Sequence, residues 1–458
     1  MTGDKSSLFS DVPVRRAVLT LAIPTVISQL ITVVYNMADT FFIGQLNDPL
    51  QVAAATLAMP CFMFLTAFAN LFGLGGSSLI SRCLGSGKPE KARHTAAFCI
   101  WTGIAVAFLY GIAILLLEPV LFPVLGARAE TWAYLKQYVF WTIGVGAVPT
   151  VMNAELAHLI RSEGYSKQAG FGVALGGILN IALDPLFIFV FRLNIAGAAI
   201  ATMLSNVIAT LYFIVFLLRI RKKSVITLNP KLYSVCYKIP SEVIIIGLPG
   251  FVMTMMSTIS NTVLNRMVSG YSDTAIAGMG IAKKIDLLAY AIAQGMTQGT
   301  LPLIGYNYSS GNLDRMKNAV KTAFAYSLIA AACGTVLLYF FAAPIAGSFI
   351  SDAETVRYGQ HFLKIICLAC PTTAVNFMCI TVFQAIGKKT QPLFLSLLRK
   401  GSLDIVFMLL LNRRMGLSGI AWATPFADWI AFGISMALVI PYLRKLSRQA
   451  AEDEFTGS

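Results

Sequence analysis

Long apolar stretches recur along the whole chain and are separated by short polar segments. Each stretch has 18 or more residues, enough for a helix to cross about 30 Å of hydrocarbon. The pattern predicts twelve membrane-spanning helices, at residues 16–43, 52–81, 95–118, 134–160, 168–191, 196–219, 241–268, 276–305, 319–342, 357–386, 391–412 and 418–443. We therefore predict an all-α polytopic membrane protein.

Composition agrees with this pattern and leaves little room for other classes. Of 458 residues, 57% are hydrophobic and 12% are charged, and the mean hydropathy is +0.73. Soluble domains carry about 25% charged residues. No glycine-rich phosphate loop, H-E-x-x-H or G-x-S-x-G motif occurs, so we expect neither an enzyme nor a cofactor. The C-x-x-C pair Cys367 and Cys370 lies inside the tenth predicted helix, which favours buried packing over a metal site.

Lysine and arginine indicate the orientation in the membrane. Most of the 35 basic residues fall at the N-terminus or in every second loop, whereas Arg413 and Arg414 lie on the other side. Under the positive-inside rule both termini are then cytoplasmic. The net charge of +14 is explained by this topology, so no nucleic-acid partner is expected.

The chain repeats itself after about 224 residues. LAIP ending at Pro24 matches IGLP ending at Pro249, and IAGAAIAT ending at Thr202 matches LSGIAWAT ending at Thr424. We predict two six-helix bundles, 1–219 and 241–446, with a cytoplasmic linker 220–240 and a tail 447–458 whose EFTGS resembles a cloning remnant. Two facing bundles are typical of an alternating-access transporter, with a channel or a non-transporting membrane protein as the alternative.

Polar residues inside the first bundle are the main functional candidates. Asp184 lies in the apolar run NIALDPLFIF, and Asp39 lies near the end of the first helix; the second repeat has Met408 and Leu264 instead. Carboxylates in hydrocarbon are costly and are generally functional. A rise of 1.5 Å per residue places Asp39, Asp184 and Thr202 at one level. The sequence thus predicts one cluster of polar side chains, Asp39, Asn180, Asp184 and Thr202, with Asn36 and Asn206 as supporting polar residues one turn below.

The second bundle has a different polar set. Lys283 and Asp286 are three residues apart and Lys400 and Asp404 are four apart, so each pair is predicted to meet on a helix face. The full predicted network is Lys283, Lys284, Asp286, Arg399, Lys400, Asp404 and Asp428. We interpret it as a structural ion-pair network, with a role in substrate release or coupling as the alternative. Candidates for lining an adaptable substrate cavity are Met253, Met255, Met256 and Asn261.

Three stretches stand out as motifs: DTFFIG at 39–44, NIALDP at 180–185 and GYNYSSGN at 305–312. With them the chain resembles the multidrug and toxic compound extrusion (MATE) family, closest to its bacterial branch that includes the DinF and MepA proteins, which implies a location in a bacterial inner membrane. The resemblance implies export of organic cations in exchange for Na⁺ or H⁺, with coupling positions that match Asp39, Asn180, Asp184 and Thr202. Another branch has acidic residues on the seventh and tenth helices, which this chain lacks. A flippase of lipid-linked sugars is the runner-up.

The coupling ion stays open at this stage. Two nearby carboxylates in a weakly polar site cannot both remain bare, so one binds a proton or both share a cation. The four candidate side chains offer the oxygen ligands of a Na⁺ site, while a proton needs only one carboxylate. We favour the proton, because Asp39 alone meets that requirement. The expected partners are a small lipophilic or cationic substrate and the lipid bilayer, with the protein acting as a monomer.

Overall fold

The computed structural model describes residues 6–350 and 352–456, and within these ranges all regular secondary structure is helical. The first half contains six helical rods: α2 (Val14–Gly44), α3 (Pro49–Gly85), α4 (Pro89–Leu116), α6–η1–α7 (Ala129–Val139, Phe140–Val145, Ala147–Ser162), α8–η2 (Ser166–Pro185, Leu186–Val190) and α9 (Asn194–Ile220). Two short helices accompany them, α1 (Ser6–Ser10) and α5 (Glu118–Leu125).

The second half also contains six rods: α10 (Ile239–Val268), α11 (Asp273–Ser309), α12 (Leu313–Phe340), α14–η4–α15 (Ala353–Ile366, Cys367–Ala369, Cys370–Ala385), α16–η5–α17 (Thr390–Ser396, Leu397–Leu403, Asp404–Met415) and α18 (Leu417–Thr456). The short helix α13 (Ala342–Gly347) precedes α14, and η3 (Pro230–Leu232) lies between the halves. The predicted all-α polytopic architecture is thus confirmed.

Several predicted details differ. Among the described residues nine helices are long and apolar enough to span a membrane, and the bent pair α6–η1–α7 makes a tenth. The rods α11 and α16–η5–α17 are not apolar enough to count among these spans, because charged and amide side chains such as Lys283, Gln298 and Arg399 lower their hydropathy. In addition, α18 continues as helix to Thr456, beyond the predicted end at residue 443.

The two halves have helix irregularities in corresponding rods. The fourth rod of the first half has a π-helical segment and a 49° bend between Val145 and Ala147, whereas that of the second half has a 3-10 turn, Cys367–Ala369, within one continuous span. Pro149 explains this bend, because it cannot donate the hydrogen bond that the Val145 carbonyl would accept. The fifth rod has a π-helical segment in both halves, Leu186–Val190 and Leu397–Leu403. In the first half this segment directly follows Pro185, which has no N–H to donate within the helix.

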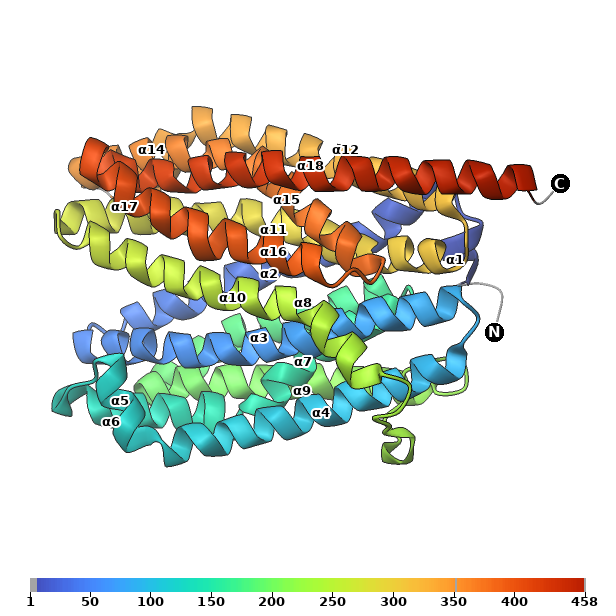
Figure 1. Ribbon diagram of the computed structural model, residues 1–458. Coiled ribbons are helices and arrows are strands. Elements are labelled where there is room, and N and C mark those ends of the chain that lie inside the picture. The colour runs from blue at the N-terminus through green and yellow to red at the C-terminus, as the bar shows by residue number, and fades with distance from the viewer. Residues whose placement is uncertain (1–5, 351, 457–458) are drawn as a thin grey trace.

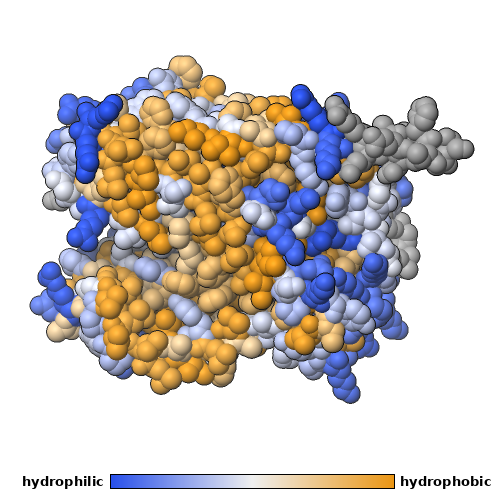
Figure 2. Space-filling view, in the orientation of Figure 1, coloured by the Kyte–Doolittle hydropathy of each residue, from blue (hydrophilic) through white to orange (hydrophobic). Residues whose placement is uncertain are grey.

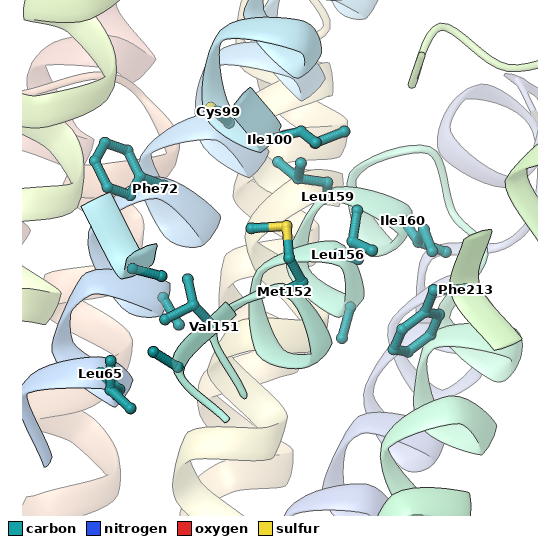
Figure 3. Packing of buried hydrophobic residues seen from close by; sticks show 14 of the residues in the cluster. Leu65, Phe72, Cys99, Ile100, Val151, Met152, Leu156, Leu159, Ile160 and Phe213 are labelled. Atoms are coloured by element: carbon teal, nitrogen blue, oxygen red, sulfur yellow. The ribbon is translucent and has the colours of Figure 1, made fainter. Parts of the chain in front are cut away.

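The halves lie one above the other with their helices nearly parallel, and both chain ends emerge at the same end of the molecule (Figure 1). Side chains from α3, α4, α7 and α9 contribute to the main apolar cluster of the first half, in which Ile100 and Leu156 lie between Phe72 on one side and Phe213 on the other (Figure 3). On the surface an apolar band runs between more polar ends (Figure 2), as a lipid-exposed protein requires.

The halves are joined at the end that carries the termini, which we call the joined end. A methyl group added at Gly247 of α10 would lie 1.8 Å from the Leu71 carbonyl oxygen, and one at Gly75 of α3 would lie 2.1 Å from that of Val243. Glycine thus allows the α3 and α10 backbones to touch, a common device between membrane helices. Ser78 Oγ donates to the Gln384 carbonyl at 2.6 Å, and Lys91 pairs with Glu242 at 2.8 Å.

The N-terminal segment also bridges the halves at the joined end. Phe9 is buried and stacks on Tyr306, while its carbonyl accepts hydrogen bonds from Asn307 and Arg315 at 3.1 and 2.6 Å. Toward the other end, the far end, apolar clusters of described residues stay within one half, around Ile43 in the first and around Leu264 in the second. The outline in Figure 2 is correspondingly notched between the halves at the far end.

Candidate functional site

The predicted coupling residues of the fifth and sixth spans meet inside the first half. Asn180 and Asp184 lie one turn apart on α8, and Thr202 faces them from α9. The Asn180 amide donates to Thr202 Oγ1 at 3.2 Å and, weakly, to Asp184 Oδ1 at 3.4 Å. All three side chains are buried, and Asp184 has no exposed surface. The spacing therefore placed these three residues correctly relative to one another.

Asp39 reaches the same region from α2. It lies close enough to Asp184 for the two carboxyl groups to interact electrostatically. Its Oδ1 atom is buried and has no hydrogen-bond partner among the described residues. The hydroxyl of Tyr138 lies within electrostatic range of both carboxylates, as does that of Tyr35 on α2. The sequence analysis missed both tyrosines, because aromatic residues are common near membrane interfaces and their positions in the sequence do not distinguish them.

A hydrogen-bonded chain of amides continues from this cluster toward the joined end. Asn206 donates to the Thr202 carbonyl at 2.9 Å and accepts a hydrogen bond from Asn153 of α7 at 2.8 Å. Asn206 thus lies where it was predicted, and Asn153 is an addition that the sequence analysis did not single out. Asn36, in contrast, is exposed and donates to the Thr32 carbonyl of its own helix at 2.8 Å, apart from this chain.

The cluster has more acceptors than donors. Three of its buried oxygens lack a partner among the described residues: Asp39 Oδ1, Asn180 Oδ1 and Asp184 Oδ2. Buried polar atoms are nearly always hydrogen-bonded, and an unpaired one destabilises the fold. Carboxylate, amide and hydroxyl oxygens are ligands for hard cations, and a carboxylate also binds a proton. The three unpartnered oxygens can therefore accept a proton, a hard cation or another hydrogen-bond donor.

In the second half the predicted charges are paired. Arg399 of η5 donates to both carboxylate oxygens of Asp428 on α18, and Thr373 donates to Asp428 at 2.5 Å. Both charged side chains are almost fully buried, at 3% and 2% exposure. Lys400 pairs with Asp404 at 3.2 Å, as the spacing predicted, and Ser260 of α10 also donates to Asp404 at 2.7 Å. These contacts favour the structural interpretation of the network.

The other predicted pair is not formed. Lys283 donates to Thr424 at 3.4 Å, and no ion pair joins Lys283 or Lys284 to a carboxylate within the described ranges. The side chain of Asp286 instead borders a cavity of about 20 Å³ together with Arg399 and Asp428. A cavity of this size holds about one water molecule. Spacing alone favoured the pair, but Thr424 on α18 offered Lys283 another partner.

The three methionines of α10 differ in how deeply they are buried. Met253 is 8% exposed and belongs to the apolar core of the second half. Met256 packs against Gly401 of η5, and Met255 is half-buried. Asn261 is exposed on the same helix. The structure thus assigns Met253 to the core, and Met255, Met256 and Asn261 stay cavity candidates.

One further buried carboxylate escaped the sequence analysis. Glu155 of α7 has no exposed surface, and neither carboxylate oxygen has a hydrogen-bond partner in the described part of the chain. Its side chain lies against Gly103 of α4, where an added methyl group would approach Oε2 to 2.1 Å. The signal was present as a glutamate within the fourth predicted span.

Two repeated helical halves joined at one end, with an ionisable cluster inside one of them, define a membrane transport protein. The MatE family model matches residues 24–186 and 249–410, so the chain belongs to that family of ion-coupled transporters and is not an enzyme. The two matches begin at 24 and 249, and this offset of 225 is the one at which Pro24 aligns with Pro249. Family membership also decides against a channel.

Similar proteins cover nearly the whole chain. The multidrug export protein MepA of Staphylococcus saprophyticus is 29% identical over 449 residues, 98% of this chain and 97% of its own length. MepA of Staphylococcus aureus (strain MSSA476) is 29% identical over 453 residues, 99% of each chain. Solved structures similar in fold include a MATE protein in complex with MaL6 (24% identity, TM-score 0.91, 98% and 100% of the chains) and a Pyrococcus furiosus transporter of the MOP superfamily (24%, 0.90, 98% and 99%).

Proposed function

We propose that this protein exports small lipophilic or cationic compounds, including drugs, in exchange for an inward-moving cation. The MepA relatives, which are multidrug export proteins, support the substrate class. The observation that carries the coupling proposal is the group of three partnerless buried oxygens on Asp39, Asn180 and Asp184. A proton or Na⁺ supplies the missing positive charge, and its release restores the unfavourable bare state.

The joining of the halves supports alternating access. With both termini in the cytoplasm, as the basic loops predict, the joined end is the cytoplasmic gate in its closed form. Cation and substrate then exchange from the far end, and opening the gate requires the contacts of Gly247 with Leu71 and of Phe9 with Arg315 to separate. An ion that binds one arrangement more tightly than the other shifts the equilibrium between them.

Asp39, Asn180, Asp184 and Thr202 are the proposed coupling residues, with Asn206 and the tyrosine Tyr138 completing their surroundings. Asp39 and Asp184 lie on different helices, α2 and α8, so a shared proton or cation draws these helices together. Their repulsion after release pushes the helices apart. In this proposal the second bundle supplies a rigid partner surface, because its buried aspartates Asp404 and Asp428 are already paired with Lys400 and Arg399.

The decisive experiment separates the two ions in liposomes that contain the full-length protein. Ethidium efflux is measured first with a pH gradient and no Na⁺, then with a Na⁺ gradient at equal pH on both sides. We expect efflux with the pH gradient alone. Efflux that responds only to the Na⁺ gradient would assign the site to Na⁺, and efflux that responds to neither would overturn the antiport proposal.

Two threonine variants test whether the Thr202 hydroxyl contributes to the response of efflux to the coupling ion. Thr202→Val removes one oxygen ligand of the proposed site at nearly constant volume, so we expect it to weaken a Na⁺ response and to leave a proton response largely intact. Thr300→Val is the matched control, because this buried hydroxyl in the second half bonds only to carbonyls of its own helix. Equal effects of both variants would show that the Thr202 hydroxyl has no specific part in coupling.

A further inference from the structure

A shallow groove lies on the membrane-facing surface near the joined end, where the first turns of α2 meet the start of α8. Its volume is about 470 Å³. Basic side chains border it, namely Arg15, Arg16 and Lys167, and its floor is apolar, formed by Leu19, Ile23 and Pro24. The groove is separate from the proposed coupling cluster, which lies further along the same two helices.

The basic rim is free to bind an anion. Arg15, Arg16 and Lys167 are all exposed, and none of them pairs with a carboxylate among the side chains that the structure describes (residues 7–272, 274–350 and 352–446). Three positive charges around one groove favour a negatively charged group, and guanidinium groups bind phosphate oxygens well. The rim therefore has the chemistry of a phosphate site.

The apolar floor of the groove places a second requirement on the ligand. Leu19, Ile23 and Ile27 are 37%, 49% and 50% exposed and follow one another at intervals of four residues, so they form one stripe on the outer face of α2. This stripe leads from the basic rim into the apolar band of the surface. A ligand that fills the whole groove consequently has a negatively charged head and a long apolar tail.

We propose that this groove binds an anionic phospholipid, with its phosphate on Arg15, Arg16 and Lys167 and an acyl chain along Leu19 and Ile23. Basic pockets between membrane helices on the cytoplasmic side are known to suit such head groups. A free phosphate ion would use the rim but would gain nothing from the apolar floor.

The position of the groove links the lipid to the helices that carry the coupling residues. A methyl group added at Gly170 of α8 would lie 2.6 Å from the Pro24 carbonyl oxygen, so α2 and α8 touch directly beneath the groove. Pro24 has no N–H, which leaves the Thr20 carbonyl beside the groove without its helical donor and weakens α2 at this point. A lipid that contacts both helices here stabilises their present arrangement.

The test is a lipid titration of the full-length protein in dodecylmaltoside micelles, with bound lipid counted by native mass spectrometry. The probes are dioleoyl phosphatidylglycerol and, as the neutral comparison, dioleoyl phosphatidylcholine. For the triple variant Arg15→Gln/Arg16→Gln/Lys167→Gln we expect the tightest phosphatidylglycerol site to weaken at least about tenfold. The matched control is Arg219→Gln/Arg221→Gln/Lys222→Gln, which removes three exposed charges outside the groove and should change binding less than about twofold.

Two further arms complete the test. The variant Arg15→Lys/Arg16→Lys/Lys167→Arg keeps the charges and should keep the site, which guards against a folding defect in the glutamine variant. Glycerol phosphate should fail to displace the lipid. Equal loss in the groove and control variants would reduce the effect to diffuse surface charge and overturn the proposal, as would unchanged binding in the groove variant or displacement by glycerol phosphate. Because the readout is binding, a failed transport assay would not affect it.

Discussion

The same isosteric change at two aspartates within membrane helices, the half-buried Asp39 and the buried Asp428, should have opposite consequences. Asp39→Asn removes a group that binds a proton or cation, whereas Asp428→Asn removes half of a buried ion pair. Both residues lie within membrane helices, and neither replacement changes the side-chain volume appreciably. We expect Asp39→Asn to abolish coupled export in a stable protein and Asp428→Asn to destabilise the protein itself.

The structure sets the size of the two effects. Asp428 accepts hydrogen bonds from two nitrogens of Arg399, one at 3.1 Å, and from Thr373 at 2.5 Å. Removing its charge leaves the Arg399 guanidinium buried without a carboxylate, which costs about 3–5 kcal/mol. No hydrogen bond within the described residues ends on the Asp39 carboxylate, and its Oδ1 is already partnerless. The Asp39→Asn variant therefore loses no contact, and the expected change in stability is below about 1 kcal/mol.

Two measurements on each variant check this reasoning. The free energy of unfolding is obtained by titrating sodium dodecyl sulfate into dodecylmaltoside micelles, and ethidium efflux is measured in vesicles with an imposed ion gradient. Arg399→Leu/Asp428→Leu is a further control, because removing both charges should be far less destabilising than removing one. Wild-type efflux in Asp39→Asn would refute the coupling role. A loss of several kcal/mol in Asp39→Asn would instead show that its carboxylate has a structural partner.

Three more changes test the joined and far ends. Arg315→Gln weakens two charge-assisted hydrogen bonds to the N-terminal segment, each worth about 1.5–3 kcal/mol. The variant should therefore increase maleimide labelling of cysteines at the joined end. Unchanged labelling would show that these hydrogen bonds do not hold the joined end closed. Gly247→Ala forces a methyl group against Leu71 and should impair transport and stability, whereas Gly280→Ala, which meets no atom within 4 Å, should not. Cysteines near Leu46 and Tyr271, once linked, should block turnover reversibly; unimpaired transport by fully linked protein would rule out motion at the far end.

Sequence alone located the helices well because hydrocarbon imposes a length and a composition on every span. It also located Asn180, Asp184 and Thr202 relative to one another, since their depth follows from the helix rise. Contacts between residues of different helices were harder to predict from the sequence. The Lys283–Asp286 pair failed because Thr424 approaches from α18, and Tyr138 was missed because only tertiary packing brings it beside Asp184.

The contact between the halves was the least predictable feature. Gly75 and Gly247 are unremarkable in the sequence, where glycine is common, and only the structure shows that each faces a backbone carbonyl. The N-terminal segment is similar, because nothing in residues 6–12 indicates that Arg315 binds its carbonyl groups. Such contacts depend on which helices meet, and that information is spread over the whole fold.

The two halves descend from one repeated sequence yet treat buried charge in opposite ways. In the second half Arg399 and Lys400 neutralise Asp428 and Asp404, so binding a further cation at either of these two aspartates would require breaking a buried pair at about 3–5 kcal/mol. In the first half no ion pair among the described side chains involves Asp39 or Asp184, and one buried oxygen of each, Asp39 Oδ1 and Asp184 Oδ2, has no hydrogen-bond partner there. A mobile ion binds where the fold has left charge unsatisfied. The electrostatics of this duplicated fold therefore favour ion coupling in the first half. They favour a structural role for the paired charges of the second half.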